Sequence, residues 1–305
     1  MTQQADMRRT MNALRTSWCA ETSSLDNWHL QHPSAGQCAV SAIIVQDYLG
    51  GEIKKCVVNG IVHYFNVVEG AVLDITTGQF GPFDIDYAAS RVKTKGEILR
   101  YNDTRRRYEL LKAKVEDFFG DLEAIAQQEA AVDYGGMGVA HLEGQSIWFG
   151  EDNDIVLVGE APARNGWLKS GVAWHDPQGK LLPSGVVMQK LLRFVDRELL
   201  ATTFLEAIQC FPADRKYLGR LAELYRPTLL RRLAILQPKV VLTLGDIPTR
   251  AVLGRSFRRL SEVVGQRFYI EGVTVVPMFH PSPISPRSYK GNVPIFEQLR
   301  KEVCV

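Results

Sequence analysis

Residues 154–162 read Asp-Ile-Val-Leu-Val-Gly-Glu-Ala-Pro, a short apolar run that ends on a glycine and is followed by a carboxylate. An apolar run bounded in this way predicts a strand that is buried on both faces. Gly159 ends the strand, and Glu160 is the first charged residue of the following loop. We therefore expect Glu160 at the carboxyl end of a strand in a parallel sheet, where such sheets bind ligands.

The sequence after this stretch alternates between strand and helix patterns. Further apolar strands are predicted at residues 202–208, 239–244 and 272–278, with helical patterns between them. This alternation is typical of a parallel sheet that helices cover on both faces. We predict that this half has an α/β fold with three layers, α/β/α, around a four-stranded parallel sheet.

The last predicted strand ends in Met-Phe-His-Pro-Ser at residues 278–282, so an imidazole leaves the same edge of the sheet as Glu160. A lone glutamate in a loop is usually solvated, and a lone histidine usually has a structural role. The placement of Glu160 and His280 at two strand ends of one sheet favours a shared catalytic site.

Three motifs in this order resemble the uracil-DNA glycosylase superfamily, over residues of about 150–303. They are Gly-Glu-Ala-Pro at 159–162, Leu-Gln-Pro-Lys-Val-Val-Leu-Thr-Leu-Gly at 236–245, and His-Pro-Ser at 280–282. The resemblance implies an enzyme that hydrolyses the N-glycosidic bond of a base in single-stranded DNA or flipped out of a duplex. DNA is then the expected partner.

The resemblance also implies roles for individual residues. Glu160 would position or deprotonate the attacking water, and His280 would donate a hydrogen bond to a carbonyl oxygen of the departing base. Trp174 stands where relatives stack an aromatic ring on the base, although a half-buried packing role explains it equally well. The candidates for contact with DNA phosphates are Ser282, Arg287 and Lys290.

Glu206 departs from the pattern of the uracil-specific relatives, which have an asparagine at this place in the second strand. An ionised carboxylate only accepts hydrogen bonds and would repel a base carbonyl. A protonated carboxyl could donate and accept, which suits a cytosine-like edge. Our hypothesis is therefore that Glu206 contacts a damaged or modified base rather than plain uracil.

The cysteines are a second departure. Relatives with an iron–sulfur cluster use four of them, whereas here Cys210 alone stands at a matching place and Tyr225 lies near the position of another ligand. We therefore expect no iron–sulfur cluster, no other cofactor and no metal.

The first half carries a different set of reactive residues. Cys38 stands at the start of a helix predicted at residues 39–49, His63 lies on a predicted strand, and Asp74 lies on the return strand predicted at 71–76. A helix N-terminus activates a thiol, and the order Cys, His, Asp is that of papain-like thiol hydrolases. With a two-residue turn at 69–70, His63 and Asp74 share one face of the sheet. Alternatively, Cys38 is a small buried residue and His63 a surface strand residue.

Residues 28–80 also resemble a bacterial family, the YunG-like proteins. The matching residues are Trp28 and the stretches 36–40, 46–51, 63–66 and 74–80. The resemblance is consistent with a compact α+β domain of papain-like or transglutaminase-like fold. A peptide or another protein is the candidate partner of this domain.

Charge divides the chain in a similar way. Residues 1–150 carry a net charge of −5, whereas residues 151–305 carry +7. We predict a YunG-like domain at 1–103, a helical connector and linker at 104–150, and a glycosylase-like domain at 151–305. The basic excess of the last domain is expected to attract DNA phosphates.

The composition argues against several other classes of protein. No apolar run approaches the roughly 18 residues that a membrane-spanning helix needs, so no membrane partner is expected. The first residues show no secretory signal pattern. The five cysteines are scattered and form no Cys-x-x-Cys motif, which favours the reducing cytoplasm over a disulfide framework.

These observations favour a DNA glycosylase that acts in DNA repair or in defence against modified foreign DNA. It would be monofunctional, because neither motif contains a lysine that could form a Schiff base with the sugar. A second interpretation makes the first domain a cysteine peptidase or amidase and the glycosylase-like half a DNA-binding module. A third makes both halves inactive binding modules.

Overall fold

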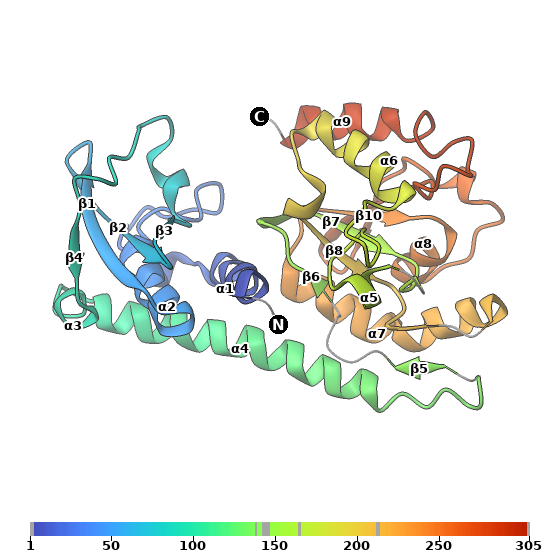
Figure 1. Cartoon of the computed structure of the whole chain (residues 1–305), viewed down its shortest axis with the longest axis horizontal. Coiled ribbons are helices and arrows are strands. Elements are labelled where there is room, and N and C mark those ends of the chain that lie inside the picture. Colours follow the sequence, from blue (N-terminus) through green and yellow to red (C-terminus); the bar gives the residue numbers. More distant parts are fainter. Residues whose placement is uncertain (1–2, 138, 142–146, 164–165, 212–213, 304–305) are drawn as a thin grey trace. The chain divides into compact units, whose positions relative to one another are not determined.

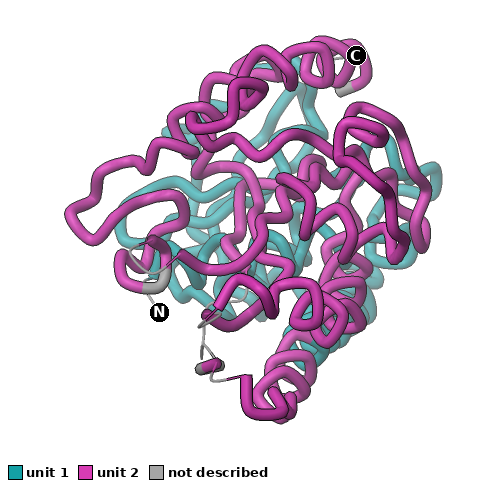
Figure 2. The backbone as a smooth tube through the Cα atoms, turned by 90° about the vertical axis from the view of Figure 1, so that its right-hand side faces the viewer, with its two compact units in different colours: residues 1–121 teal, residues 122–305 magenta. Residues whose placement is uncertain are grey.

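The chain forms two compact units, residues 1–121 and 122–305, which Figure 2 distinguishes by colour. The computed structural model describes residues 3–137, 139–141, 147–163, 166–211 and 214–303. Helix α4 (Thr104–Ala130) contains residues of both units. Each unit has a sheet of its own and is described separately below.

The sheet of the second unit has four parallel strands in its centre. In spatial order these are β12 (Val273–Met278), β10 (Val240–Leu244), β7 (Asp152–Gly159) and β8 (Thr202–Glu206). The pairs β12–β10, β10–β7 and β7–β8 all run parallel. The strand that contains residues 154–159 therefore lies inside the sheet, with a parallel neighbour on each side.

The sheet is larger than the predicted four strands, because an antiparallel strand extends it at each edge. Strand β11 (Phe268–Ile270) pairs with β12, and β6 (Ile147–Trp148) pairs with β8. Strands of two or three residues are too short to show a periodic pattern. Only their hydrogen bonds to a neighbouring strand define them, and the sequence does not display those bonds.

Helices cover both faces of this sheet, as expected for an α/β protein (Figure 1). One apolar cluster joins Ile155 and Leu157 of β7 to α6 (Pro183–Leu192) and α9 (Val293–Val303). A second cluster joins Val156 and Val158 to α7 (Leu218–Leu236) and α8 (Asp246–Leu253). Successive residues of β7 thus enter opposite cores, which explains why the strand is apolar throughout.

Shorter elements complete the second unit. They are helix α5 (Trp167–Ser170), the 3₁₀ helix η5 (Arg215–Tyr217), and the antiparallel pair β5 (Ala140–His141) and β9 (Cys210–Phe211). A buried, bidentate ion pair between Glu129 and Arg232 joins the end of α4 to α7. Each of the two residues is about 1% exposed.

The first unit is built on an antiparallel sheet in the order β3-β2-β1-β4. Its strands are β1 (Glu52–Val58), β2 (Ile61–Val68), β3 (Ala71–Leu73) and β4 (Arg91–Lys93), and its helices include α1 (Gln3–Ser17), α2 (Cys38–Leu49) and α3 (Lys95–Ile98). Helix α2 packs against β2. The buried Asn66 side chain of β2 donates to the Ala42 carbonyl of α2 at 2.9 Å, which fixes the helix on the sheet.

The turn between β2 and β3 has the expected register, but β3 is shorter than predicted. Val68 pairs with Ala71, so residues 69–70 form the two-residue turn. The strand ends at Leu73 because the Asp74 carboxylate accepts a hydrogen bond from the backbone N–H of Thr76 at 3.0 Å. A side chain that bonds its own backbone two residues later forms a turn and replaces the ladder.

Within the parts of the chain that the structure covers, no helix is both long and apolar enough to cross a membrane.

The Glu129–Arg232 ion pair leads to a prediction about stability. Glu129→Ala leaves a buried guanidinium without its partner, and we expect the second unit to lose about 3–5 kcal/mol of unfolding free energy. The measurement is differential scanning calorimetry, with Glu116→Ala as a control because the Glu116–Lys112 pair on the same helix is exposed and should contribute less than about 1 kcal/mol. The double variant Glu129→Ala/Arg232→Met should recover most of the loss. Equal stability of Glu129→Ala and wild type would contradict this account.

Candidate active site

The ends of the four parallel strands of the second unit meet at one edge of the sheet. Gly159, the last residue of β7, pairs with Glu206, the last residue of β8. Leu244 of β10 pairs with Met278 of β12, and the chain then leads through Phe279 to His280. Parallel pairing therefore gathers Glu160, Glu206 and His280, which the sequence predicted as site residues.

These strand ends surround a cavity of about 620 Å³. Four of the predicted residues line it: Glu160, Trp174, Glu206 and His280. Trp167, Phe204, Phe211 and Arg215 also line it. The volume lies in the range of sites that bind small organic ligands, and the mixture of aromatic and ionisable groups is that of a site for a polar ring.

Glu160 forms an ion pair with Arg215, with 2.8 Å between its Oε1 and the guanidinium. The carboxylate is largely buried, whereas the Arg215 side chain is 77% exposed and comes from η5. This ion pair places the Glu160 carboxylate next to a guanidinium at the edge of the cavity. The sequence shows Arg215 as one of many basic residues, and nothing in its pattern distinguishes it from those on the surface.

His280 is held as a neutral hydrogen-bond donor. Its Nδ1 accepts the backbone N–H of Ser282 at 3.1 Å, so in the neutral ring the proton lies on Nε2. Although the residue is exposed, desolvation by the surrounding protein lowers its pKa; the charge of Arg215 acts in the same direction, and that of Glu160 opposes it.

The backbone next to His280 is fixed by a buried asparagine. The Asn292 side chain accepts the N–H of Phe279 and donates to the Phe279 carbonyl, both at 2.9 Å. Asn292 has no exposed surface. Asn292 lies 12 residues after His280. No sequence motif connects residues at this spacing, so nothing in the sequence singled it out.

Glu206 has no charged partner among the described residues, in contrast to Glu160. Its Oε2 is buried and has no hydrogen-bond partner among the residues that the structure describes. Burial raises its pKa to about 8, and the charge of Glu160 acts in the same direction. A Cβ on Gly159 would lie 2.2 Å from this oxygen, so the glycine of the first motif leaves the space that the Glu206 carboxyl occupies.

Trp174 both lines the cavity and packs in the core. It is 7% exposed, and its ring centroid lies 4.6 Å from that of Phe204. Its φ of 67° is in the left-handed region, which non-glycine residues rarely adopt. The Trp174 carbonyl accepts the N–H of Leu182 at 2.7 Å, which holds the loop against the start of α6. Trp174 is therefore more buried than the half-buried packing residue that the sequence suggested.

The three reactive residues of the first unit also come together. Cys38 is the first residue of α2, His63 lies in β2, and Asp74 follows β3. His63 is fully buried and its Nε2 lies 2.5 Å from Asp74 Oδ2. Burial opposes the charged imidazole, but hydrogen bonds to Asp74 and to the Cys38 thiol outweigh it and raise the pKa of His63 to about 9.

Two residues that the sequence analysis did not single out support this cluster. Tyr87 donates its hydroxyl to Asp74 Oδ2 at 3.1 Å. The Gln79 side-chain nitrogen lies 3.3 Å from His63 Nδ1. His63 is thus neither an exposed strand residue nor isolated from Cys38. The His63 ring is oriented by the Asp74 carboxylate, which is itself held in place by Tyr87.

Two family models match different parts of the chain. The sequence model of the uracil DNA glycosylase superfamily matches residues 148–303, slightly more than half of the chain. The chain belongs to this superfamily. Membership supports DNA glycosylase activity and DNA as the substrate at the level of the family, and it implies the α/β fold described above.

The N-terminal part of this superfamily member matches a second family. The model of the YunG protein family covers residues 6–120. The uncharacterized protein YunG of Bacillus subtilis (strain 168) is 39% identical over 74 residues, which are 24% of this chain and 63% of that protein. The N-terminal resemblance is confirmed, and the match spans less than two thirds of the relative.

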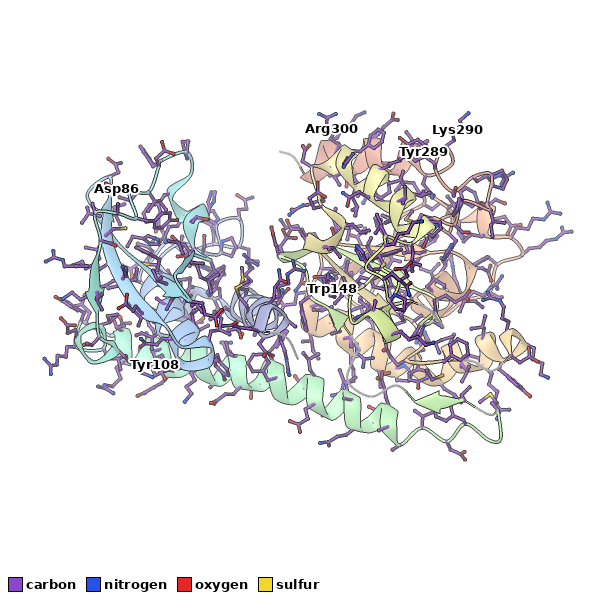
Figure 3. The ribbon with its side chains drawn as sticks, in the orientation of Figure 1. Asp86, Tyr108, Trp148, Tyr289, Lys290 and Arg300 are labelled. Atoms are coloured by element: carbon purple, nitrogen blue, oxygen red, sulfur yellow. The ribbon has the colours of Figure 1, made fainter. Side chains whose placement is uncertain are left out.

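The three residues expected to contact phosphates are not among those that line the glycosylase cavity. Ser282 supports His280 through its backbone. The Arg287 guanidinium lies 5.4 Å from the centre of the Phe279 ring. Lys290 lies on the outer surface next to Tyr289 (Figure 3). A contact between these side chains and DNA stays a prediction.

Cys210 is fully buried in the core of the superfamily domain. It hydrogen-bonds Tyr225, and the Tyr225 hydroxyl also bonds the hydroxyl of Tyr134. In the described ranges of the chain, no group of three or more His, Cys, Asp or Glu side chains could hold a metal ion.

The pKa of Glu206 leads to a prediction about stability. Between about pH 4.5 and 8 the folded protein keeps a proton on Glu206 that the unfolded chain releases. Wild type should therefore lose stability relative to Glu206→Gln as the pH rises through this window, by up to about 1.4 kcal/mol per pH unit, and the difference should level off above pH 8. Calorimetry of both proteins from pH 4.5 to 9 measures it, with Glu223→Gln, an exposed glutamate of α7, as control. A difference that does not change with pH would show that Glu206 is ionised in the folded state.

Proposed function

We propose that the second unit is a monofunctional DNA glycosylase that hydrolyses the N-glycosidic bond of a damaged or modified base, in DNA repair or in defence against modified foreign DNA. The observation that carries this proposal is the shared cavity of Glu160 and His280. One presents a charged carboxylate and the other a neutral N–H donor at the same sheet edge.

The chemistry of the bond explains why both groups are needed. Breaking it builds positive charge on the sugar and negative charge on the base. Glu160 is the group that accepts a proton from the attacking water and offsets the charge on the sugar, while Arg215 holds its carboxylate in place. His280 donates from Nε2 to a carbonyl oxygen of the departing base, which stabilises the negative charge.

Substrate binding follows from the rest of the cavity. A base flipped out of the stack would meet Trp174, Trp167, Phe204 and Phe211, which offer apolar walls and ring faces. Ser282, Arg287 and Lys290 are proposed to contact the flanking phosphates. Among the described residues that line the cavity there is no lysine to form a Schiff base, and the proposed reaction uses water alone and no cofactor.

A second function is favoured by a separate observation, the buried Asp74–His63 pair beside Cys38. We propose that the first unit has a papain-like fold and is a cysteine peptidase or amidase. Cys38 would attack a carbonyl carbon, and His63 would give its proton to the departing amine. A peptide or protein is then the substrate of this unit. If this were the main activity, the second unit would serve to bind DNA.

The glycosylase proposal predicts the effect of two substitutions. Glu160→Gln and His280→Ala should each lower the rate of base release by about 10²–10³-fold, because each removes a group that acts in the transition state. The assay is mass spectrometry of bases released from a panel of DNAs with modified bases, together with alkaline cleavage at abasic sites. Glu223→Gln is the matched control and should keep the wild-type rate. Base release that is unchanged in Glu160→Gln would refute the assigned role of Glu160.

The thiol hydrolase proposal predicts selective labelling of Cys38. Near neutral pH, iodoacetamide should modify Cys38 at least about tenfold faster than Cys56, because burial raises the pKa of Cys56. His63→Ala should slow the labelling of Cys38 and leave that of Cys56 unchanged. Mass spectrometry of tryptic peptides separates the sites, and Cys19→Ser removes a more exposed thiol that would consume reagent. Equal rates at Cys38 and Cys56 would count against a catalytic thiol.

A further inference from the structure

The glycosylase cavity contains two carboxyl groups in opposite settings. Glu160 is paired with a guanidinium at 2.8 Å. Glu206 lies at the end of the neighbouring strand, and its buried Oε2 has no partner among the described residues. The carboxyl group rests against the Cα of Gly159, where a methyl group would collide with it. A polar group this enclosed and unpaired is costly to keep unless a bound ligand completes its hydrogen bonds.

A protonated carboxyl offers one donor and one acceptor side by side. This pair fits two kinds of base edge. One is the lactam edge of uracil, with an N–H beside a carbonyl. The other is an amino group beside an unprotonated ring nitrogen, as in cytosine and adenine. A side-chain amide would serve equally well for hydrogen bonding alone, so hydrogen bonding does not explain a glutamate at this position.

The property that separates a carboxyl group from an amide is a proton that can be transferred. A departing base carries the electron pair of the broken bond, and a proton delivered to it makes it a better leaving group. A ring nitrogen with a free lone pair can take that proton, whereas the N–H of a lactam edge cannot.

We propose that Glu206 is the general acid of this site and that its substrates are bases with an amino group beside an unprotonated ring nitrogen. The inference rests on the proposed glycosylase function. It adds a catalytic residue to Glu160 and His280 and assigns the chemical class of the base. On an amino-edged pyrimidine the His280 N–H would donate to the ring carbonyl, whereas on an amino-edged purine, which has no carbonyl, it would donate to a ring nitrogen. Glu206 accepts a hydrogen bond from the amino group and donates its own proton to the ring nitrogen.

The protons and electrons of this step balance. The bond between the sugar C1′ and the base nitrogen breaks, and its electron pair goes to the base. Water forms a bond to C1′ and gives one proton to the Glu160 carboxylate. The Glu206 proton moves to the ring nitrogen, and the base leaves neutral. Transfer of the proton from Glu160 to Glu206 then restores both carboxyl groups.

The charged and titratable groups around Glu206 support this assignment. From the loop after β7, Glu160 places a negative charge near it, while Arg215 of η5 is already paired with Glu160. From the end of β12, His280 has a lowered pKa and is a neutral donor. Burial raises the pKa of Glu206 to about 8. Glu206 is therefore the cavity's source of an acidic proton at neutral pH, among the lining residues that the structure describes.

The test uses two matched pairs of substrates in otherwise identical oligonucleotides. One pair contains 5-hydroxymethylcytosine or 5-hydroxymethyluracil, which share a substituent and differ in the edge. The other contains N6-methyladenine or hypoxanthine. Wild type should release an amino-edged base at least about tenfold faster than its lactam-edged partner, and the pair on which this occurs distinguishes a pyrimidine from a purine substrate. The rate should fall as the pH rises above about 8.

Glu206→Gln removes only the transferable proton, because glutamine has the same shape as a protonated glutamate and keeps a hydrogen-bond donor and an acceptor. It should bind the same DNA, as measured by fluorescence anisotropy, yet release the base about 10²–10⁴-fold more slowly. The fall above pH 8 should also disappear from its pH profile. Circular dichroism of the variant checks that the fold is retained.

The outcomes separate this inference from the function on which it rests. Release of a lactam-edged base at an equal or higher rate, or a Glu206→Gln rate and pH profile like those of wild type, overturns the general acid while the glycosylase stands. The absence of base release from all four oligonucleotides overturns the proposed function and this inference with it.

Discussion

The glycosylase cavity depends on the parallel pairing of β7 with a strand on each side. Parallel strands end at the same edge, so the residues that follow β7, β8 and β12 are delivered to one place. Backbone bonds continue this alignment into the loops: Ala207 donates to Gly159 at 2.9 Å, and Gly245 donates to Met278 at 3.0 Å. A shift of one residue in β8 would turn Glu206 to the opposite face. The chemistry of the site is therefore a consequence of strand register.

Within this arrangement of strands, the ionisable groups of the cavity lie in different environments. Glu160 forms an ion pair with Arg215, whereas Glu206 has no such partner among the described residues and burial favours its neutral form. His280 is neutral because the surrounding protein disfavours its charge, and the Ser282 N–H directs its remaining proton to Nε2. Ionisable groups that lie in such different environments can take different roles in one reaction. Gly159 contributes by leaving room for the second carboxyl group.

The first unit also brings reactive side chains together, but it does so with a turn and a helix N-terminus rather than with parallel strands. A tight turn between β2 and β3 brings Asp74 back beside His63, and the N-terminus of α2 brings Cys38 to the same imidazole. Here the carboxylate and the thiol favour the charged form of the histidine, in contrast to the neutral His280 of the other unit. The two units also differ in net charge, −1 for residues 1–121 and +3 for residues 122–305, so the unit with DNA as its expected partner carries the small positive excess.

The sequence by itself determined the α/β class, the central strands and the residues at their ends, because apolar runs and the motifs around Glu160 and His280 depend only on local order. It also determined the two-residue turn that places Asp74 near His63. Arg215, Asn292, Tyr87 and the edge strands β6 and β11 became recognisable only in the tertiary structure, since each is defined by a contact with a distant segment. The protonation of Glu206 was likewise decided by the tertiary structure, because burial depends on what surrounds a side chain and no sequence pattern reports it.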